Sequence, residues 1–168
     1  MKNQTCCFTG HRNLQKNEIA EIEKSLEHEL IKLISQGIQY FGSGEALGFD
    51  TLAAQTVLKL KKKYPQIKLI MVLPCKEQTK NWCDKDIITY NKILKKADKV
   101  VYTSEHYHQS CMHIRNRHLV DHSSHCIAYL NRAKGGTAYT VNYAKQNGLQ
   151  IINLATRKTS PQHCSCAP

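Results

Sequence analysis

Short apolar segments alternate with segments of helical spacing along nearly the whole sequence, and this alternation restricts the chain to few architectures. The segments expected to form strands are 5–9, 38–41, 67–73, 99–103, 126–130 and 150–154. The segments expected to form helices, with apolar residues every three or four positions, are 17–36, 50–63, 87–96, 113–122 and 137–146. Repeated strand–helix–strand units predict an α/β fold, a single Rossmann-like domain whose mostly parallel sheet carries helices on both faces.

Local signals support this division of the chain. Gly37 stands at the position where a glycine commonly ends a helix, and Asp50 is expected to cap the helix that follows it. Segment 67–73 is continuously apolar, which is typical of a strand buried on both faces of a parallel sheet. Beyond residue 156 the sequence is polar and contains proline. We therefore expect one domain over residues 1–156 and a polar tail over residues 157–168.

The composition indicates a globular chain that favours phosphate-bearing partners. The formal net charge is +11, and 41% of the residues are hydrophobic. No apolar run approaches the roughly 18 residues that a membrane span needs, and residues 1–9 lack the pattern of a signal peptide. We therefore expect a cytoplasmic protein without a membrane partner. The first candidate partner is a small nucleotide or nucleotide-sugar molecule. Nucleic acid is a second candidate, although no DNA-reading or RNA-reading motif is present, and the chain could also form a homo-oligomer.

The cysteines and histidines do not predict a metal site. The eight cysteines have irregular spacing without paired Cys-x-x-Cys elements, and without a secretory signal we expect thiols rather than disulfides. Six histidines lie between positions 106 and 125, but no His-Glu-x-x-His arrangement is among them. The tail residues His163, Cys164 and Cys166 could bind a soft metal, yet two or three ligands on a tail make a poor site. The expected metal and cofactor content is none.

Three glycine-containing turns follow expected strands, at the edge of the sheet where parallel α/β folds bind ligands. Glycine lets the backbone approach a ligand closely, and a helix N-terminus offers free N–H groups to a phosphate. The three turns are Thr9-Gly10-His11-Arg12, Gly42-Ser43-Gly44 continuing to Gly48 and Asp50, and Gly135-Gly136-Thr137.

Five side chains in or near these turns are candidate ligand contacts. Arg12 and Arg115 can each grip a phosphate with two parallel hydrogen bonds, and Asn116 adjoins Arg115. Asp50 can cap its helix, bind ribose hydroxyls or act on a glycosidic bond. Trp82, the single tryptophan, can stack on a base or pack in the core.

Taken in order, these motifs resemble the YpsA-like branch of the SLOG superfamily, which groups DprA/Smf DNA-processing proteins with LOG-type phosphoribohydrolases. The resemblance covers about residues 4–155. It rests on Phe8-Thr9-Gly10-His11-Arg12, Gly42-Ser43-Gly44 with Gly48-x-Asp50, Trp82, Tyr90, Ala97-Asp98, Arg115-Asn116 and Gly135-Gly136-Thr137. It implies a Rossmann-like fold that senses or sequesters an ADP-ribose or NAD-related molecule, with Gly10, Arg12, Gly48, Asp50, Arg115 and the Gly135–Thr137 turn around the pocket.

The sequence departs from the hydrolase pattern at one point. LOG-type hydrolases carry glutamates after the glycine-rich turn, whereas here Thr137 is followed by Ala-Tyr-Thr-Val. Cleavage of an N-glycosidic bond usually needs a carboxylate, and Asp50 and Glu45 are the candidates near the expected edge. Binding without turnover is the leading hypothesis. The alternatives are a nucleotide N-glycosidase using Asp50 or Glu45, and DprA-like DNA binding.

Overall fold

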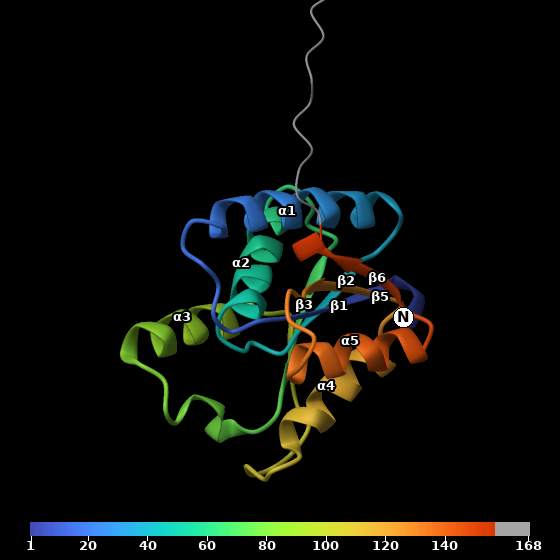
Figure 1. Cartoon of the computed structure of the whole chain (residues 1–168). Coiled ribbons are helices and arrows are strands. Elements are labelled where there is room, and N and C mark those ends of the chain that lie inside the picture. Colours follow the sequence, from blue (N-terminus) through green and yellow to red (C-terminus); the bar gives the residue numbers. More distant parts are fainter. Residues whose placement is uncertain (157–168) are drawn as a thin grey trace, which may run out of the picture.

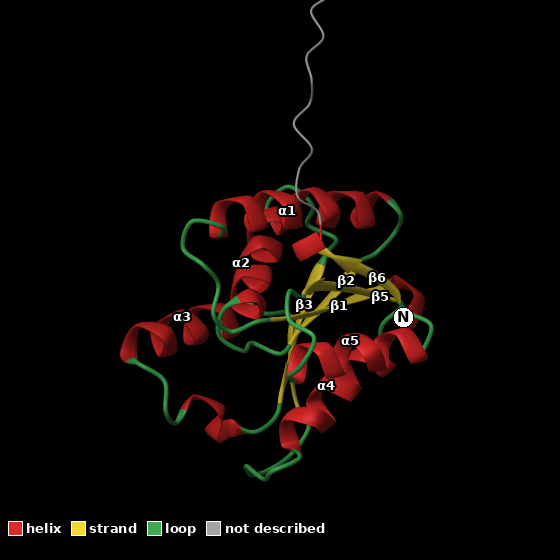
Figure 2. Ribbon diagram, viewed as in Figure 1, coloured by secondary structure: helices red, strands yellow, loops and turns green. Residues whose placement is uncertain are grey.

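A computed structural model describes residues 1–156 and confirms the alternation of strands and helices (Figures 1 and 2). The strands are β1 (Thr5–Gly10), β2 (Tyr40–Ser43), β3 (Lys68–Leu73), β4 (Lys99–Tyr102), β5 (His125–Tyr129) and β6 (Gln150–Asn153). The helices are α1 (Ile19–Ser35), α2 (Phe49–Lys61), α3 (Asp84–Leu94), α4 (Cys111–Asp121) and α5 (Gly136–Gln146). The hypothesis about the tail residues His163, Cys164 and Cys166 lies outside the described residues.

The described strands form one six-stranded parallel sheet in the order β4-β3-β2-β1-β5-β6. The chain builds outward from β1 to β4 on one side and then returns to place β5 on the other side of β1. The point where β1 meets β5 is therefore the position at which the strand order reverses. In open parallel sheets, ligands bind at the carboxyl ends of the strands beside such a reversal.

Helices cover both faces of the sheet, as predicted (Figure 1). On one face, α1, α2 and α3 pack over a core that includes Phe8, Leu26 and Met71. On the other face, α4 and α5 pack over a smaller core that includes Cys7, Leu119 and Val120. Because successive side chains of a strand point to opposite faces, Phe8 and Cys7 belong to different cores.

Two helix starts differ from the expectation. Asp50 does not cap α2, so that prediction was wrong: the cap position is held by Gly48 with a φ of 82°, and the Asp50 carboxylate accepts from the Ala46 N–H instead, at 3.4 Å. Helix α3 begins at Asp84, three residues before the expected position 87. Its first turn is polar and carries Asp84 and Asp86, which suit the positive end of the helix dipole but give no apolar periodicity.

The other boundaries shift by a few residues at most. Helix α4 starts at Cys111 rather than at residue 113, so Arg115 lies in its second turn and not in its first. Strand β2 spans Tyr40–Ser43 rather than 38–41, because its ladder with β3 continues through Gly42 and Ser43. Gly37, with a φ of 92°, follows the end of α1, as predicted.

The cysteines found in residues 1–156 are free thiols, five of them buried and Cys83 exposed. Within the same residues, no three His, Cys, Asp or Glu side chains are grouped so as to hold a metal ion. None of the described helices has the length and apolar character that crossing a membrane requires.

Candidate functional site

A cavity of about 340 Å³ opens at the carboxyl end of β1, beside the reversal of strand order. It brings together predicted residues from four places in the chain: the turn after β1, the start of α2, the second turn of α4 and the start of α5. These residues are Thr9, Gly10, His11, Arg12, Asp50, Arg115, Asn116, Gly136 and Thr137. Ala46 and Met112 complete the lining.

Other predicted site residues lie beside or beneath this cavity. Gly48 lines a neighbouring cavity of about 520 Å³, and Trp82 lines another of about 830 Å³. Gly42, Ser43 and Gly44 are buried in β2 and the turn that follows it. Gly135 is exposed with a φ of 110° and stands directly before α5.

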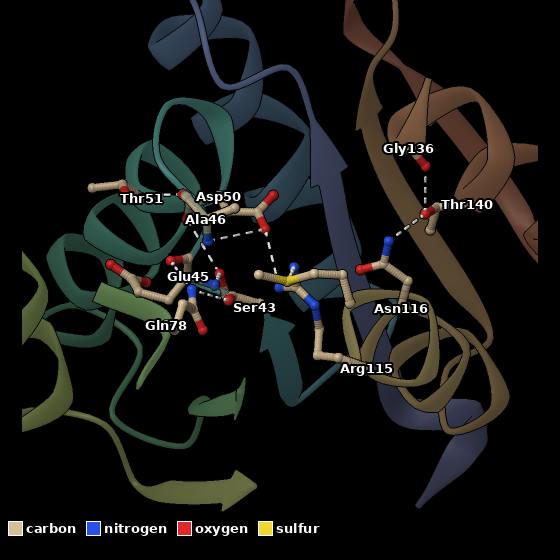
Figure 3. Close-up of polar contacts among 12 residues, drawn as sticks. Ser43, Glu45, Ala46, Asp50, Thr51, Gln78, Arg115, Asn116, Gly136 and Thr140 are labelled. Atoms are coloured by element: carbon tan, nitrogen blue, oxygen red, sulfur yellow. Dashed lines mark hydrogen bonds and ion pairs between the residues drawn. The ribbon is translucent and has the colours of Figure 1, made fainter. Parts of the chain in front are cut away.

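A buried pair of opposite charges forms the floor of the cavity (Figure 3). The Arg115 Nη1 atom lies 3.7 Å from Asp50 Oδ2, and the two residues are 4% and 5% exposed. Burial raises the pKa of Asp50 to about 6, although Arg115, the Ala46 N–H and Arg12 each favour the ionised form. Burial likewise lowers the pKa of Arg115. Since Arg115 Nε, Arg115 Nη1 and Asp50 Oδ1 have no hydrogen-bond partner in residues 1–156, the pair is incompletely satisfied.

Glu45 lies behind the cavity rather than in its lining. It is fully buried, and burial together with the nearby Asp50 charge raises its pKa to about 8, with Arg115 and Thr51 offsetting part of the rise. Its backbone is left-handed, with a φ of 49°, which no other non-glycine residue of the described chain adopts. Burying a polar group and holding a non-glycine residue in the left-handed region both cost free energy. Local contacts must therefore hold Glu45 in this position.

Two polar side chains hold the β2–α2 turn in this shape. The Glu45 N–H donates to Ser43 Oγ at 3.2 Å, and the Ser43 hydroxyl donates to the Asp50 carbonyl at 3.2 Å. Gln78 Nε2 donates to the carbonyls of Gly44 and Glu45, at 3.3 and 2.8 Å. A Cβ at Gly44 would collide with the Arg115 guanidinium. Glycine at position 44 is therefore what allows Arg115 to reach Asp50.

The N-terminus of α5 forms the opposite wall of the cavity. Asn116 Nδ2 donates to Thr140 Oγ1 at 3.0 Å, and the Thr140 hydroxyl donates to the Gly136 carbonyl at 2.8 Å (Figure 3). No acidic residue lies in the first turn of α5, and a Cβ at Gly136 would meet nothing within 4 Å. The start of α5 therefore has open space beside Gly136, and the first N–H groups of a helix are a common site for anions.

His11 ties the turn after β1 to the turn before α5. The Asn131 N–H donates to His11 Nε2 at 3.1 Å. This bond requires a neutral ring whose proton is on Nδ1. Partial burial and the charge of Arg132 lower the pKa of His11, which favours that neutral form.

Arg12 is an exposed cation with no ion pair to any residue in the range 1–156. It lines all three cavities at this edge of the sheet. Its charge also lowers the pKa of Arg115, because the two guanidinium groups repel each other. An anion bound between the two arginines would relieve that repulsion.

Comparisons with known proteins agree with this architecture. The family model described as the YspA SLOG family matches residues 6–156. The SPbeta prophage-derived protein YoqJ of Bacillus subtilis is 34% identical over 131 residues, which cover 70% of this chain and 77% of YoqJ.

Two solved structures share the fold. DprA from Helicobacter pylori, described with a single-stranded DNA binding mode, has a TM-score of 0.66 at 19% identity, covering 95% of this chain and 68% of that one. DprA from Streptococcus pneumoniae has a TM-score of 0.62 at 16% identity and covers 89% of this chain. The present chain spans only 50% of that second protein.

Proposed function

Because this chain belongs to the YspA SLOG family, we propose that it binds a nucleotide-derived ligand, such as ADP-ribose or an NAD-related molecule, in the 340 Å³ cavity. One observation carries the proposal: two arginines and an open helix N-terminus surround one cavity at the reversal of strand order. Each of these groups favours an anion, and their convergence favours a phosphate.

In this proposal the ligand phosphate lies between Arg12 and the first turn of α5, where Gly136 leaves room and Thr137 adds a hydroxyl donor. Ribose hydroxyls would then face Asn116 and Asp50, which line the same cavity. A carboxylate that accepts from hydroxyl groups needs no change of protonation at neutral pH, since the pKa of Asp50 is about 6.

Sensing or sequestration fits the site better than turnover. Asp50 is already engaged by Arg115 and the Ala46 N–H, and Glu45 is absent from the cavity lining. The first turn of α5 supplies no acid in their place. An N-glycosidase would instead have to use Asp50, and an Asp50→Asn variant separates the two cases. Release of free base by the wild-type protein, lost in that variant, would make the chain a hydrolase.

The test of the binding proposal is native mass spectrometry with AMP, NAD and ADP-ribose, followed by chromatography of each mixture. We expect one unaltered nucleotide per chain for at least one of these compounds. Arg12→Ala should weaken its binding about tenfold or more, because a charge-assisted hydrogen bond to phosphate is lost. Lys24→Ala, which removes an exposed cation on α1, is the matched control. Equal affinity in the Arg12 and Lys24 variants would refute the site.

We further propose a cytoplasmic location, which the free thiols at Cys6, Cys7 and Cys126 support because thiols persist in reducing compartments.

A further inference from the structure

A second and larger cavity adjoins the proposed phosphate cavity. Its volume is about 830 Å³, and it shares Arg12 and Met112 with the smaller one. Apart from Leu47, which lies between β2 and α2, the rest of its lining comes from the segment between β3 and α3 and from the segment between β4 and α4. It includes Gln78, Lys80, Trp82, His106 and Tyr107. A ligand longer than a phosphorylated sugar could therefore cross Arg12 and occupy both cavities.

Aromatic rings line this second cavity. Trp82 is half-buried and stands edge-on to Tyr90 of α3, with ring centroids 5.5 Å apart, so its indole is held by the core. Tyr107 is 65% exposed. The His106 ring is held by Glu77 through Nδ1 and Oε1 at 3.2 Å. An exposed tyrosine and a fixed indole in the lining of one cavity are rings on which the flat face of a base can stack.

The third cavity at this edge provides the contrast. It also touches Arg12, but its described lining is aliphatic and polar, with Leu14, Leu52 and Gln55 among its residues and no aromatic ring. A ligand whose phosphate contacts Arg12 can thus stack its base in only one of the two neighbouring cavities, the one that contains Trp82.

We infer that the cavity containing Trp82 and Tyr107 is a subsite for the base of the ligand. The ligand would then be a nucleoside diphosphate carrying a second group: the base beside Trp82, the diphosphate over Arg12, and the second group in the 340 Å³ cavity. This inference rests on the proposed function, and it adds to that function a separate cavity for the base of an ADP-ribose-type ligand.

The experiment uses Trp82 as its own reporter, because it is the only tryptophan in the chain. Titration of the full chain with ADP-ribose should change the tryptophan emission, since the base contacts the indole. Titration with ribose 5-phosphate, which has no base, should leave the emission unchanged while isothermal titration calorimetry detects its binding.

A pair of variants at Tyr107 tests the other wall. Tyr107→Ala should weaken ADP-ribose binding roughly tenfold, the loss expected for one stacking partner, and should leave ribose 5-phosphate affinity unchanged. Tyr107→Phe keeps the ring and should bind ADP-ribose like the wild type. Gln55→Ala, in the cavity without aromatic rings, is the matched control and should also bind like the wild type.

The outcomes separate this inference from the proposed function. Suppose that Arg12→Ala abolishes ADP-ribose binding, Tyr107→Ala leaves the affinity unchanged, and ADP-ribose does not alter the Trp82 emission. The base subsite is then wrong and the phosphate site stands. If Gln55→Ala weakens binding in place of Tyr107→Ala, the base lies in the other cavity and the inference is overturned. If the wild type binds neither compound, the proposed function fails and the subsite fails with it.

Discussion

At the scale of single residues, Glu45 combines features that a stable fold would avoid. It is fully buried, its φ is 49°, and the pKa of its carboxyl is raised to about 8. The sequence showed Glu45 only as an acid near the expected edge of the sheet. Its burial could not be read from the chain, because it depends on Gln78, which is distant in sequence, packing against the β2–α2 turn.

The raised pKa of Glu45 predicts a pH dependence of stability. The folded state keeps the proton up to about pH 8, whereas the unfolded chain releases it near the ordinary value of 4.5. The free energy of unfolding should therefore fall as the pH rises through this window. Glu45→Gln carries no such proton and should be more stable than the wild type at pH 8 by roughly 2–4 kcal/mol, with the advantage nearly gone at pH 4.

Urea unfolding of both proteins at pH 4, 6 and 8 measures this difference. Asp50, whose raised pKa gives a slope of the same sign between about pH 4 and 6, is present in both proteins and cancels in the comparison. A constant difference across the three pH values would show that Glu45 is ionised in the folded state.

Gly44 and Gly136 predict opposite responses to the same substitution. Gly44→Ala places a methyl group where the buried Arg115 guanidinium lies and should destabilise the fold by about 3 kcal/mol or more, because Asp50 loses its partner. Gly136→Ala meets open space and should leave the melting temperature unchanged or slightly higher. Thermal unfolding of the two variants checks this contrast, and similar melting temperatures would contradict it.

At the scale of elements, the sequence predicted the order of strands and helices, which follows from a repeated pattern. It missed the helix starts and caps that depend on the residues of a single turn. Periodicity placed every described strand and α-helix in order, because burial on a sheet or helix face imposes that spacing, but it did not indicate the short 3-10 helices. The start of α3 was missed because its first turn is polar, and the cap of α2 because a left-handed glycine replaced the expected aspartate. Of the cavity lining, Ala46 and Met112 carry no polar signal that could have drawn attention to them.

The N-terminus of α5 allows stability and binding to be separated. An aspartate at position 136 would complement the positive end of the helix dipole and should raise stability by about 0.5 kcal/mol. The same carboxylate would repel a phosphate, so Gly136→Asp should weaken nucleotide binding at least tenfold. Calorimetric binding and thermal unfolding on one preparation test both effects, and unchanged affinity would remove α5 from the site.

At the scale of the whole molecule, the net charge of +11 favours anionic partners without choosing among them. Several of the cations form ion pairs at the surface of the fold, which leaves the net charge unchanged. Lys59 is paired with Glu23 and Glu27, and Asp98 is shared by Lys61 and Lys68. These cations lie on α2 and β3, in ion pairs that do not involve the cavity residues.

This distribution predicts weak, salt-sensitive binding of DNA. A single-stranded oligonucleotide should bind at low ionic strength, and its affinity should fall steeply to little measurable binding near 150 mM salt. Fluorescence anisotropy across a salt series measures the slope. Tight binding that persists at physiological salt would instead favour the DprA-like alternative.

The central position of β1 has a consequence for synthesis on the ribosome. The strand contributes the first loop of the cavity and pairs at once with β2, yet its other neighbour, β5, begins at His125. The contact between His11 and Asn131 joins residues 120 positions apart. A nascent chain therefore carries Arg12 exposed for most of its translation, and the cavity is completed only after the segment that contains Thr137 has left the exit tunnel. The cavity is thus completed late, after β1 to β5 have emerged and before β6 follows.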